Sequence, residues 1–281
     1  MGPAASHGDG GGARTELEAG DIVRLPHRAF PLSAEETALL VAGLSDGGAK
    51  NVSLDPATGA VSGVAPGAGQ GARLAALMGR FADWATALVA EIAPPYADHL
   101  ERGRTSFRPR AIDAAPLSPR KDDRRLHADA FVSRPTGGAR ILRVFVNINP
   151  DGASRLWQVG EPFERYARRW IGQIRPPWPG EAWLLYRLGL TRTRRTAYDT
   201  LMLGLHDRAK LDGAYQAGAP RREVAFPAGS SWVVFTDAVV HAAVAGRFAL
   251  EQTFYLPVDA MADPAASPLR VLEAMTGRRL A

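Results

Sequence analysis

A histidine and an aspartate stand two positions apart within residues 125–131, as His127 and Asp129. We expect these residues to form a strand, in which alternate side chains point to the same side, so that both groups would face one interior. Two imidazoles and one carboxylate on one face of a metal, with open positions opposite, form the iron site of non-haem oxygenases. The pair could therefore supply two of three ligands to Fe(II).

An H-x-D triplet alone is also common where the two residues merely pack. A third ligand, which must come from far along the chain, therefore decides whether the triplet is part of a metal site. The best candidate is His241, which we expect near the end of a buried strand that follows a turn at Pro227 and Gly229. After a turn at Gly246, residues 247–256 would add a second strand and complete a hairpin. This order, with H-x-D first and a histidine on a late hairpin, is similar to that of 2-oxoglutarate/Fe(II) oxygenases.

The composition limits the classes of protein that the chain can belong to. Its 281 residues, 46% of them hydrophobic, are enough for one large domain. The lack of cysteine excludes disulfides, Fe–S clusters and cysteine-ligated zinc, so a metal must be held by histidine and carboxylate side chains. No apolar stretch reaches the roughly 18 residues of a spanning helix, and the N-terminus lacks the pattern of a signal peptide. We therefore expect a protein that neither spans a membrane nor is exported.

The charge is basic and comes mostly from arginine. A net charge of +5 and a pI of about 9.9 indicate an anionic partner. Residues 155–195 combine tryptophan and arginine with an apolar helical face, which is typical of a segment at a membrane surface with anionic lipids. The alternative is a helical insertion packed on the core with a solvated arginine edge. No nucleic-acid motif is present, so nucleic acid is not expected, and no protein partner is indicated.

The first part of the chain is predicted to support the site rather than to form it. Residues 1–20 are rich in glycine, alanine and serine and are predicted to be disordered. Residues 21–104 would be a helical support region. Ser33 and Glu36 have the spacing of a capping box for a helix that runs to about Leu44. Apolar side chains at helical spacing predict an amphipathic helix over residues 72–92.

Residues 105–258 are predicted to form the core of a mainly β (α+β) fold, a jelly roll or double-stranded β-helix. A helical insertion at 160–215 would interrupt it, and residues 21–281 would make one domain. The clearest strand covers residues 139–149, where Arg143 shares a face with two asparagines. Polar groups on a buried face are costly without partners, so this face predicts the wall of a cavity that binds an anion.

Several blocks of the sequence resemble the Kdo hydroxylase family. They are residues 121–123, 125–131, 133–136, 140–145, 147–150, 198–199, 202–203, 205–207, 250–254 and 267–270. The resemblance extends from about residue 105 to the C-terminus. It implies an Fe(II)/2-oxoglutarate-dependent dioxygenase on a double-stranded β-helix. The implied substrate is 3-deoxy-D-manno-oct-2-ulosonic acid (Kdo) in the lipid A–inner core of lipopolysaccharide, hydroxylated at C3 to give the octulosonic acid Ko.

The resemblance also implies the cofactors and the place of the protein. Fe(II), 2-oxoglutarate as cosubstrate and O2 would be required, with ascorbate as an optional additive in vitro. His127, Asp129 and His241 would hold the iron, and the presence of the carboxylate favours hydroxylation over halogenation. Because the substrate is a Kdo-containing lipid A glycolipid, we expect a cytoplasmic protein bound peripherally at the cytoplasmic face of the inner membrane.

Arginines are the best candidates to hold the distal carboxylate of 2-oxoglutarate, because a guanidinium binds a carboxylate through two hydrogen bonds. Arg143 lies on the predicted cavity face, whereas Arg247 resembles the arginine of prolyl-hydroxylase-like enzymes, and both stay open. Further candidates for the cosubstrate are Arg140 and Asn147. The residues expected to contact the substrate are Arg108, Arg110, Lys121, Arg134 and His206.

Alternatives to this prediction remain. The same enzyme class could act on another small anionic or sugar substrate, or the chain could be a non-enzymatic, cupin-like module that binds a glycan while His127 and Asp129 merely pack. For His206 the alternative is a core histidine with satisfied hydrogen bonds. For Arg108 and Arg110 it is a solvated sheet edge.

Overall fold

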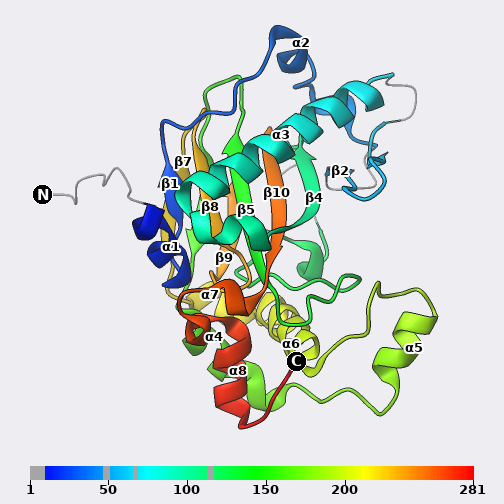
Figure 1. Ribbon diagram of the computed structural model, residues 1–281, viewed down its shortest axis with the longest axis vertical. Coiled ribbons are helices and arrows are strands. Elements are labelled where there is room, and N and C mark those ends of the chain that lie inside the picture. The colour runs from blue at the N-terminus through cyan, green and yellow to red at the C-terminus, as the bar shows by residue number, and fades with distance from the viewer. Residues whose placement is uncertain (1–9, 47–50, 66–68, 113–116) are drawn as a thin grey trace, which may run out of the picture.

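Two antiparallel sheets form the centre of the computed structural model, which describes residues 10–46, 51–65, 69–112 and 117–281 (Figure 1). The larger sheet has the order β1 (Val23–Leu25), β8 (Ser231–Phe235), β5 (Arg140–Asn147), β10 (Ala249–Leu256), β4 (Glu101–Arg108), β2 (Val52–Leu54) and β3 (Val61–Ser62). The smaller sheet has the order β7 (Arg222–Phe226), β6 (Arg155–Val159) and β9 (His241–Ala245). The predicted jelly roll is confirmed.

Aromatic side chains on the inner faces join the two sheets. Phe145 of β5 and Trp232 of β8 stack with their ring centroids 5.0 Å apart. Trp157 of β6 meets these two rings edge-on, at 5.1 Å and 5.7 Å. Phe226 of β7 stacks on Trp232 at 3.9 Å. Stacked and edge-on pairs are the favourable aromatic geometries, so this cluster stabilises the sandwich beyond the burial of its area.

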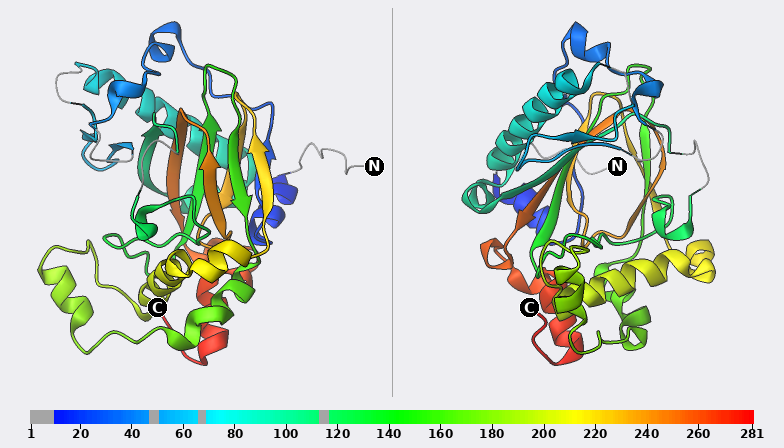
Figure 2. Two further views of the ribbon diagram at one scale, coloured as in Figure 1. Left: turned by 180° about the vertical axis from the view of Figure 1, so that it is seen from behind. Right: turned by 90° about the vertical axis from the view of Figure 1, so that its right-hand side faces the viewer.

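The helix α3 (Gly71–Ile92) covers the outer face of the larger sheet, as the views from the front and the side show (Figures 1 and 2). It packs against β4 and β10. Its buried side chains recur at helical spacing and are Leu74, Leu77, Met78, Phe81, Ala82, Ala85, Leu88 and Val89. This amphipathic pattern is the one predicted for residues 72–92.

The predicted capping box is present, but its helix is shorter than expected. The Ser33 side chain accepts from the Glu36 N–H, and the Glu36 side chain accepts from the Ser33 N–H. The helix α2 (Ala34–Thr37) ends after one turn, and the 3-10 helix η1 (Ala42–Leu44) follows it. A capping box fixes where a helix begins and says nothing about its length.

The region of residues 21–104 also contributes strands, although it was predicted to be a helical support. β1 pairs with β8 at one edge of the larger sheet, and β2 pairs with β4 towards the other edge. β4 begins at Glu101, a few residues before the predicted start of the core. Strands of two or three residues are too short to show an alternating pattern, which explains why the sequence did not reveal β2 and β3.

The N-terminal segment differs from its prediction. Disorder was expected for residues 1–20, and this is wrong for α1 (Gly10–Glu18), which is a helix. Leu17 is fully buried in the main core. Residues 1–9 lie outside the described residues. The glycine-rich composition of this segment gave no indication that two of its side chains, Leu17 and Glu18, are buried and hold the helix against the domain.

Helices gather at one end of the sandwich, at the bottom of Figure 1. They are α4 (Phe163–Trp170), α5 (Glu181–Arg187), α6 (Ala197–Leu211), α7 (Gly213–Gly218) and α8 (Pro268–Thr276). The first four form the predicted insertion, and α5 stands away from the body (Figure 1). The remaining 3-10 helices are η2 (Pro94–His99), η3 (Pro119–Lys121), η4 (Ile171–Gln173), η5 (Val258–Ala260) and η6 (Pro264–Ala266). Within the described ranges, no helix has the length and apolarity needed to cross a membrane.

Replacing Glu18 tests whether α1 is part of the folded domain. The buried Glu18 carboxylate accepts the Tyr96 hydroxyl at 2.6 Å and the N–H groups of Ala262 and Asp263 at 2.9 Å and 2.7 Å. Glu18→Ala would leave these donors unsatisfied, so we expect the free energy of unfolding to fall by about 3 kcal/mol in urea titrations. Glu16→Ala, at an exposed position of the same helix, should change it by less than about 0.5 kcal/mol. Equal effects would contradict the docking of α1.

Candidate metal centre and anion cavity

His127, Asp129 and His241 come together as predicted. One candidate ligand atom from each lies within 4.8 Å of the other two. The Nε2 atom of His127 is 3.5 Å from Oδ1 of Asp129, and all three side chains are buried. Two imidazoles and one carboxylate at this spacing fit the facial triad of non-haem iron enzymes.

Backbone pairing between distant segments creates this cluster. His127 and His241 form an isolated antiparallel bridge, with N–H to O distances of 3.0 Å and 2.8 Å. The Asp129 N–H donates to the carbonyl of Thr236 at 2.8 Å. Residues 125–131 were predicted to be a strand and are instead a loop, which these backbone hydrogen bonds to His241 and Thr236 hold in place. The loop still directs both side chains to the same site.

The apolar run that ends at His241 is two strands rather than one. β8 ends at Phe235, a turn is closed by the Val239 N–H bonding to the Phe235 carbonyl at 2.9 Å, and β9 begins at His241. The predicted hairpin is also wrong, because β9 and β10 belong to different sheets. Residues on both sides of the turn are apolar and buried, so the polar Thr236 and Asp237 within the turn are the local sign of the break.

Carbonyl groups orient both imidazoles. Nδ1 of His127 lies 2.7 Å from the Arg125 carbonyl, and Nδ1 of His241 lies 2.8 Å from the Val239 carbonyl. A carbonyl only accepts, so Nδ1 carries the hydrogen and Nε2 keeps its lone pair for a metal. Burial lowers the pKa of His127, and burial with the neighbouring His127 lowers the pKa of His241 to about 4. Both rings are therefore neutral and able to ligate near pH 7.

Arg143 keeps the aspartate ionised. Burial alone would raise the pKa of Asp129, but the guanidinium of Arg143, with Nη2 at 3.1 Å from Oδ2, acts together with the neighbouring His127 and His241 to hold the pKa well below its usual value. The Nη1 atom of the same side chain lies 2.9 Å from Oε1 of Glu251 on β10. Arg143 thus lies where the sequence placed it, on the inner face of β5.

A second arginine shares the Glu251 carboxylate. Arg108 of β4 donates to Oε2 of Glu251 through Nε at 2.8 Å and Nη2 at 2.5 Å. Burial would raise the pKa of Glu251, and the charges of Arg108 and Arg143 outweigh burial and lower it. Arg108 is therefore part of the interior, and the solvated edge considered for it is wrong.

Arg155 and Trp157 on the inner face of β6 were missed by the sequence analysis. Arg155 is 2% exposed, and within the described residues its Nε and Nη1 atoms have no hydrogen-bond partner. Burial, together with the charge of Arg108, lowers the pKa of Arg155 to about 9. A buried guanidinium without an anion is unfavourable, so this site fits an anionic ligand. The alternation of Arg155, Trp157 and Val159 in β6 is the signal that could have identified them.

These arginines line a cavity next to the triad. Arg108, Arg110 and Arg155 surround a volume of about 90 Å³, with Asp122, Asp123 and Ala243 also in its wall. Ala243 follows His241 by two positions on β9, which places the cavity beside the metal ligands. Trp157 stacks on the His241 ring at 4.7 Å, and its buried Nε1 has no partner in the part of the chain that the structure describes. The unpaired guanidinium nitrogens of Arg155 therefore make this cavity the candidate site for an anion.

Three of the residues predicted to hold the cosubstrate are engaged elsewhere. Arg140 lies three positions before Arg143, on the other face of β5, where it pairs with Asp237 at 2.8 Å. The Nδ2 atom of Asn147 donates to two backbone carbonyls, at 3.0 Å and 2.9 Å. Arg247 is 40% exposed and pairs with Asp151. The structure therefore does not bring Arg140, Asn147 or Arg247 to the metal centre.

The residues predicted to contact substrate are divided between the site and the surface. Arg110 lines the cavity, and Lys121 is exposed in η3 on the approach to His127. Arg134, in the loop after the H-x-D, pairs with Asp55 at 3.2 Å. His206 of α6 meets the His127 ring edge-on, with the centroids 5.3 Å apart. Of these, Arg110 and His206 are the nearest to the chemistry.

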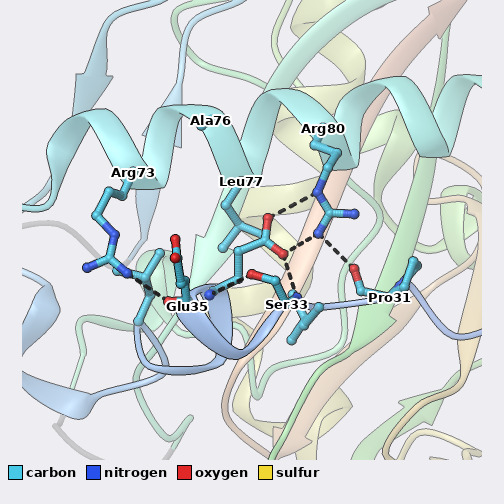
Figure 3. Close-up of a pocket in the computed structure, with 10 residues that line it drawn as sticks. Pro31, Ser33, Glu35, Arg73, Ala76, Leu77 and Arg80 are labelled. Atoms are coloured by element: carbon cyan, nitrogen blue, oxygen red, sulfur yellow. Dashed lines mark hydrogen bonds and ion pairs between the residues drawn. The ribbon is translucent and has the colours of Figure 1, made fainter.

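A larger groove between α2 and α3 is not a candidate site (Figure 3). It has a volume of about 470 Å³, and its wall consists of residues from the ranges 31–39 and 73–80, none of them from β9 or from the loop that carries His127 and Asp129. Its cations are already paired: Arg80 binds Glu36 and the Pro31 carbonyl, and Arg73 binds the Glu35 carbonyl at 2.9 Å. These contacts fasten α2 to α3 and engage both arginines of the groove.

Comparison with known proteins agrees with this geometry. A crystal structure of the Kdo hydroxylase KdoO, a non-heme Fe(II) alphaketoglutarate-dependent dioxygenase, in complex with alphaketoglutarate and Fe(III), is 44% identical to this chain. It superposes with a TM-score of 0.92, and the match covers 97% of this chain and 91% of that one. A cobalt(II) complex of KdoO is 46% identical, with a TM-score of 0.91 and coverage of 96% and 91%. No curated protein matches the chain.

The family comparison covers nearly the whole sequence. Residues 4–279 match the family of 3-deoxy-D-manno-oct-2-ulosonic acid (Kdo) hydroxylases. The match includes the triad, the arginine-lined cavity and the helical insertion. The chain therefore belongs to the Kdo hydroxylase family.

Proposed function

We propose that this protein is an Fe(II)- and 2-oxoglutarate-dependent hydroxylase that acts at C3 of Kdo in the lipid A–inner core glycolipid. The observation that carries the proposal is an unpaired, buried arginine beside two histidines and an aspartate arranged as metal ligands. The KdoO structures with alphaketoglutarate, with succinate and with iron support it, because they hold the cosubstrate and the coproduct of such a reaction.

The residues present fit both cofactors. His127, Asp129 and His241 would hold Fe(II), and Arg155 with Arg108 would bind the distal carboxylate of 2-oxoglutarate. When bound, iron and 2-oxoglutarate use O2 to convert the cosubstrate to succinate and CO2 while one oxygen atom enters a C–H bond of the substrate. The orphaned Nε and Nη1 of Arg155 are the donors that such a carboxylate requires.

The protein's own groups keep this site in a reactive state. Arg143 holds Asp129 in one orientation and in its ionised form, so the carboxylate is available to a metal without a proton leaving first. The carbonyls behind His127 and His241 fix the ring positions before any ligand arrives. Burial of all three ligands excludes bulk water, which strengthens their interactions with charged ligands.

Replacing Arg155 tests the assignment of the cosubstrate site. Arg155→Gln should raise the dissociation constant of 2-oxoglutarate by about 10- to 100-fold, because a charge-assisted bond is lost. Calorimetry on cobalt(II)-loaded protein without O2 measures this directly. Since Arg155 has no partner, the same change should not lower the melting temperature of the ligand-free protein.

The matched control for this experiment is Arg247→Gln. Arg247 lies near the surface and pairs with Asp151, so its replacement should leave 2-oxoglutarate binding within about twofold of the unaltered protein. A larger loss from Arg247→Gln than from Arg155→Gln would overturn the assignment.

An exposed apolar patch supports action at a membrane surface. The patch consists of large apolar side chains that are exposed to solvent in and around α5, namely Trp178, Trp183, Leu184, Tyr186, Leu188 and Leu190. Their exposures reach 62% at Leu188. Arg187 lies among them in the sequence, and Arg175, Arg192 and Arg194 flank them. Apolar and aromatic side chains mixed with cations suit the interface of a bilayer with anionic lipids.

The apolar patch is joined to the metal centre through one loop. The Arg192 N–H donates to the Ser133 carbonyl at 2.9 Å, and the Arg195 guanidinium donates to the Val132 carbonyl at 2.7 Å. Both carbonyls belong to the loop that follows Asp129. A lipid-linked sugar approaching from the patch would therefore reach the triad along this loop. The lack of cysteine agrees with our proposal that the protein acts at the cytoplasmic face of the inner membrane.

Vesicle binding tests the role of the patch. The double replacement Trp183→Glu and Leu188→Glu should lower cosedimentation with vesicles containing phosphatidylglycerol by about tenfold or more, because apolar contact is lost and negative charge is added. Val41→Glu is the control, since Val41 is a comparably exposed apolar residue at 46% that lies outside the patch. Unchanged binding of the double variant would refute the membrane proposal.

The reaction itself is tested by product analysis. Iron-loaded protein exposed to O2 and 2-oxoglutarate should release succinate and add one oxygen atom to Kdo-lipid A, as detected by mass spectrometry. Asp129→Ala should abolish both results, because it removes a metal ligand. Succinate without a modified glycolipid would keep the enzyme class and reject the substrate. The absence of both iron and turnover would favour a glycan-binding module.

A further inference from the structure

His206 lies against the metal centre without being a ligand in the triad. Its ring meets the His127 ring at 89°, with the centroids 5.3 Å apart, and its side chain is 13% exposed. The Tyr166 hydroxyl donates to the carbonyl of Leu205 at 3.0 Å, which fixes the turn of α6 that carries His206. The helical insertion therefore holds one histidine against the ring of His127.

A chain of polar contacts sets the orientation of this ring. Nε of Arg120 donates to Oδ2 of Asp207 at 3.0 Å, and Oδ1 of Asp207 lies 3.0 Å from Nδ1 of His206. An ionised carboxylate only accepts hydrogen bonds, so Nδ1 of His206 carries the hydrogen. In the neutral ring the other nitrogen, Nε2, is then an acceptor. No residue in the described part of the chain hydrogen-bonds to it.

We infer that Nε2 of His206 accepts a hydrogen bond from a hydroxyl group of the sugar substrate and so positions that sugar at the metal centre. The inference rests on the proposed function and adds the chemical group that is recognised. An acceptor attracts O–H groups and repels carboxylates, whereas the cations Arg110 and Lys121 are suited to the acidic group of the sugar. His206 is thus a positioning residue that distinguishes a polyhydroxylated substrate from a simple acid.

His206→Phe tests this inference, because phenylalanine keeps an aromatic ring against His127 and removes both nitrogens. With cobalt(II) and 2-oxoglutarate bound and O2 excluded, the dissociation constant of Kdo-lipid A should rise about 3- to 10-fold, the usual effect of losing one neutral hydrogen bond. With iron and O2, the ratio of succinate to hydroxylated glycolipid should rise. A loosely held sugar escapes hydroxylation more often after the cosubstrate has been converted to succinate. The affinity for 2-oxoglutarate should stay the same.

A second variant and a control strengthen the test. Asp207→Asn lets the new amide donate to Nδ1, which moves the hydrogen to Nε2, so it should weaken glycolipid binding in the same direction as His206→Phe. His99→Phe, at an exposed position of η2, should have no effect.

The outcomes separate this inference from the proposed function. Unchanged glycolipid affinity and coupling in His206→Phe would overturn the inference while leaving the hydroxylase intact. Weaker cobalt or 2-oxoglutarate binding in that variant would also overturn it, because His206 would then act only by packing on His127. If the unaltered protein forms no hydroxylated glycolipid, the proposed function fails first.

Discussion

An excess of buried positive charge between the two sheets is the constraint on which the site depends. Arg108, Arg143 and Arg155 enter one interior, where Glu251 and Asp129 are the carboxylates that pair with the first two. Two nitrogens of the third guanidinium have no hydrogen-bond partner within the described residues, and burial together with the charge of Arg108 lowers the pKa of Arg155 despite the nearby Glu251 and Asp123. Since a bound metal adds further positive charge, the site is completed only by a ligand with negative charge.

The sandwich makes this arrangement stable. Arg108 and Arg143 come from the larger sheet, whereas Arg155 and His241 come from the smaller one. The aromatic cluster around Trp157 fixes the spacing of the sheets, and the backbone bridge between His127 and His241 closes the end at which the ligands meet. The helical insertion then adds His206 and the exposed patch on the same side. We propose that these rigid elements hold the metal and the cosubstrate, and that the insertion contacts the glycolipid substrate.

The sequence revealed features whose signal is local. The H-x-D spacing, the helix α3 and the face of β5 that carries Arg143 could all be predicted, because each follows from a pattern within one segment. The position of Arg140 could also have been judged from spacing, since residues three apart in a strand face opposite sides. Arg155 and Trp157 were harder to recognise, because their importance comes from Arg108 and His241, which are distant in sequence. The break between β8 and β9 was missed for a different reason, because the residues on both sides of the turn are equally apolar and buried.

The central claim is that the triad and the arginine-lined cavity bind Fe(II) and 2-oxoglutarate as one unit. Anaerobic titration of Fe(II)-loaded protein with 2-oxoglutarate, followed by visible absorption, measures this most directly. A charge-transfer band should form only when both are present, and glutarate, which lacks the keto group, should compete for the site without producing the band. Failure of the band to appear with saturating Fe(II) and 2-oxoglutarate would contradict the account.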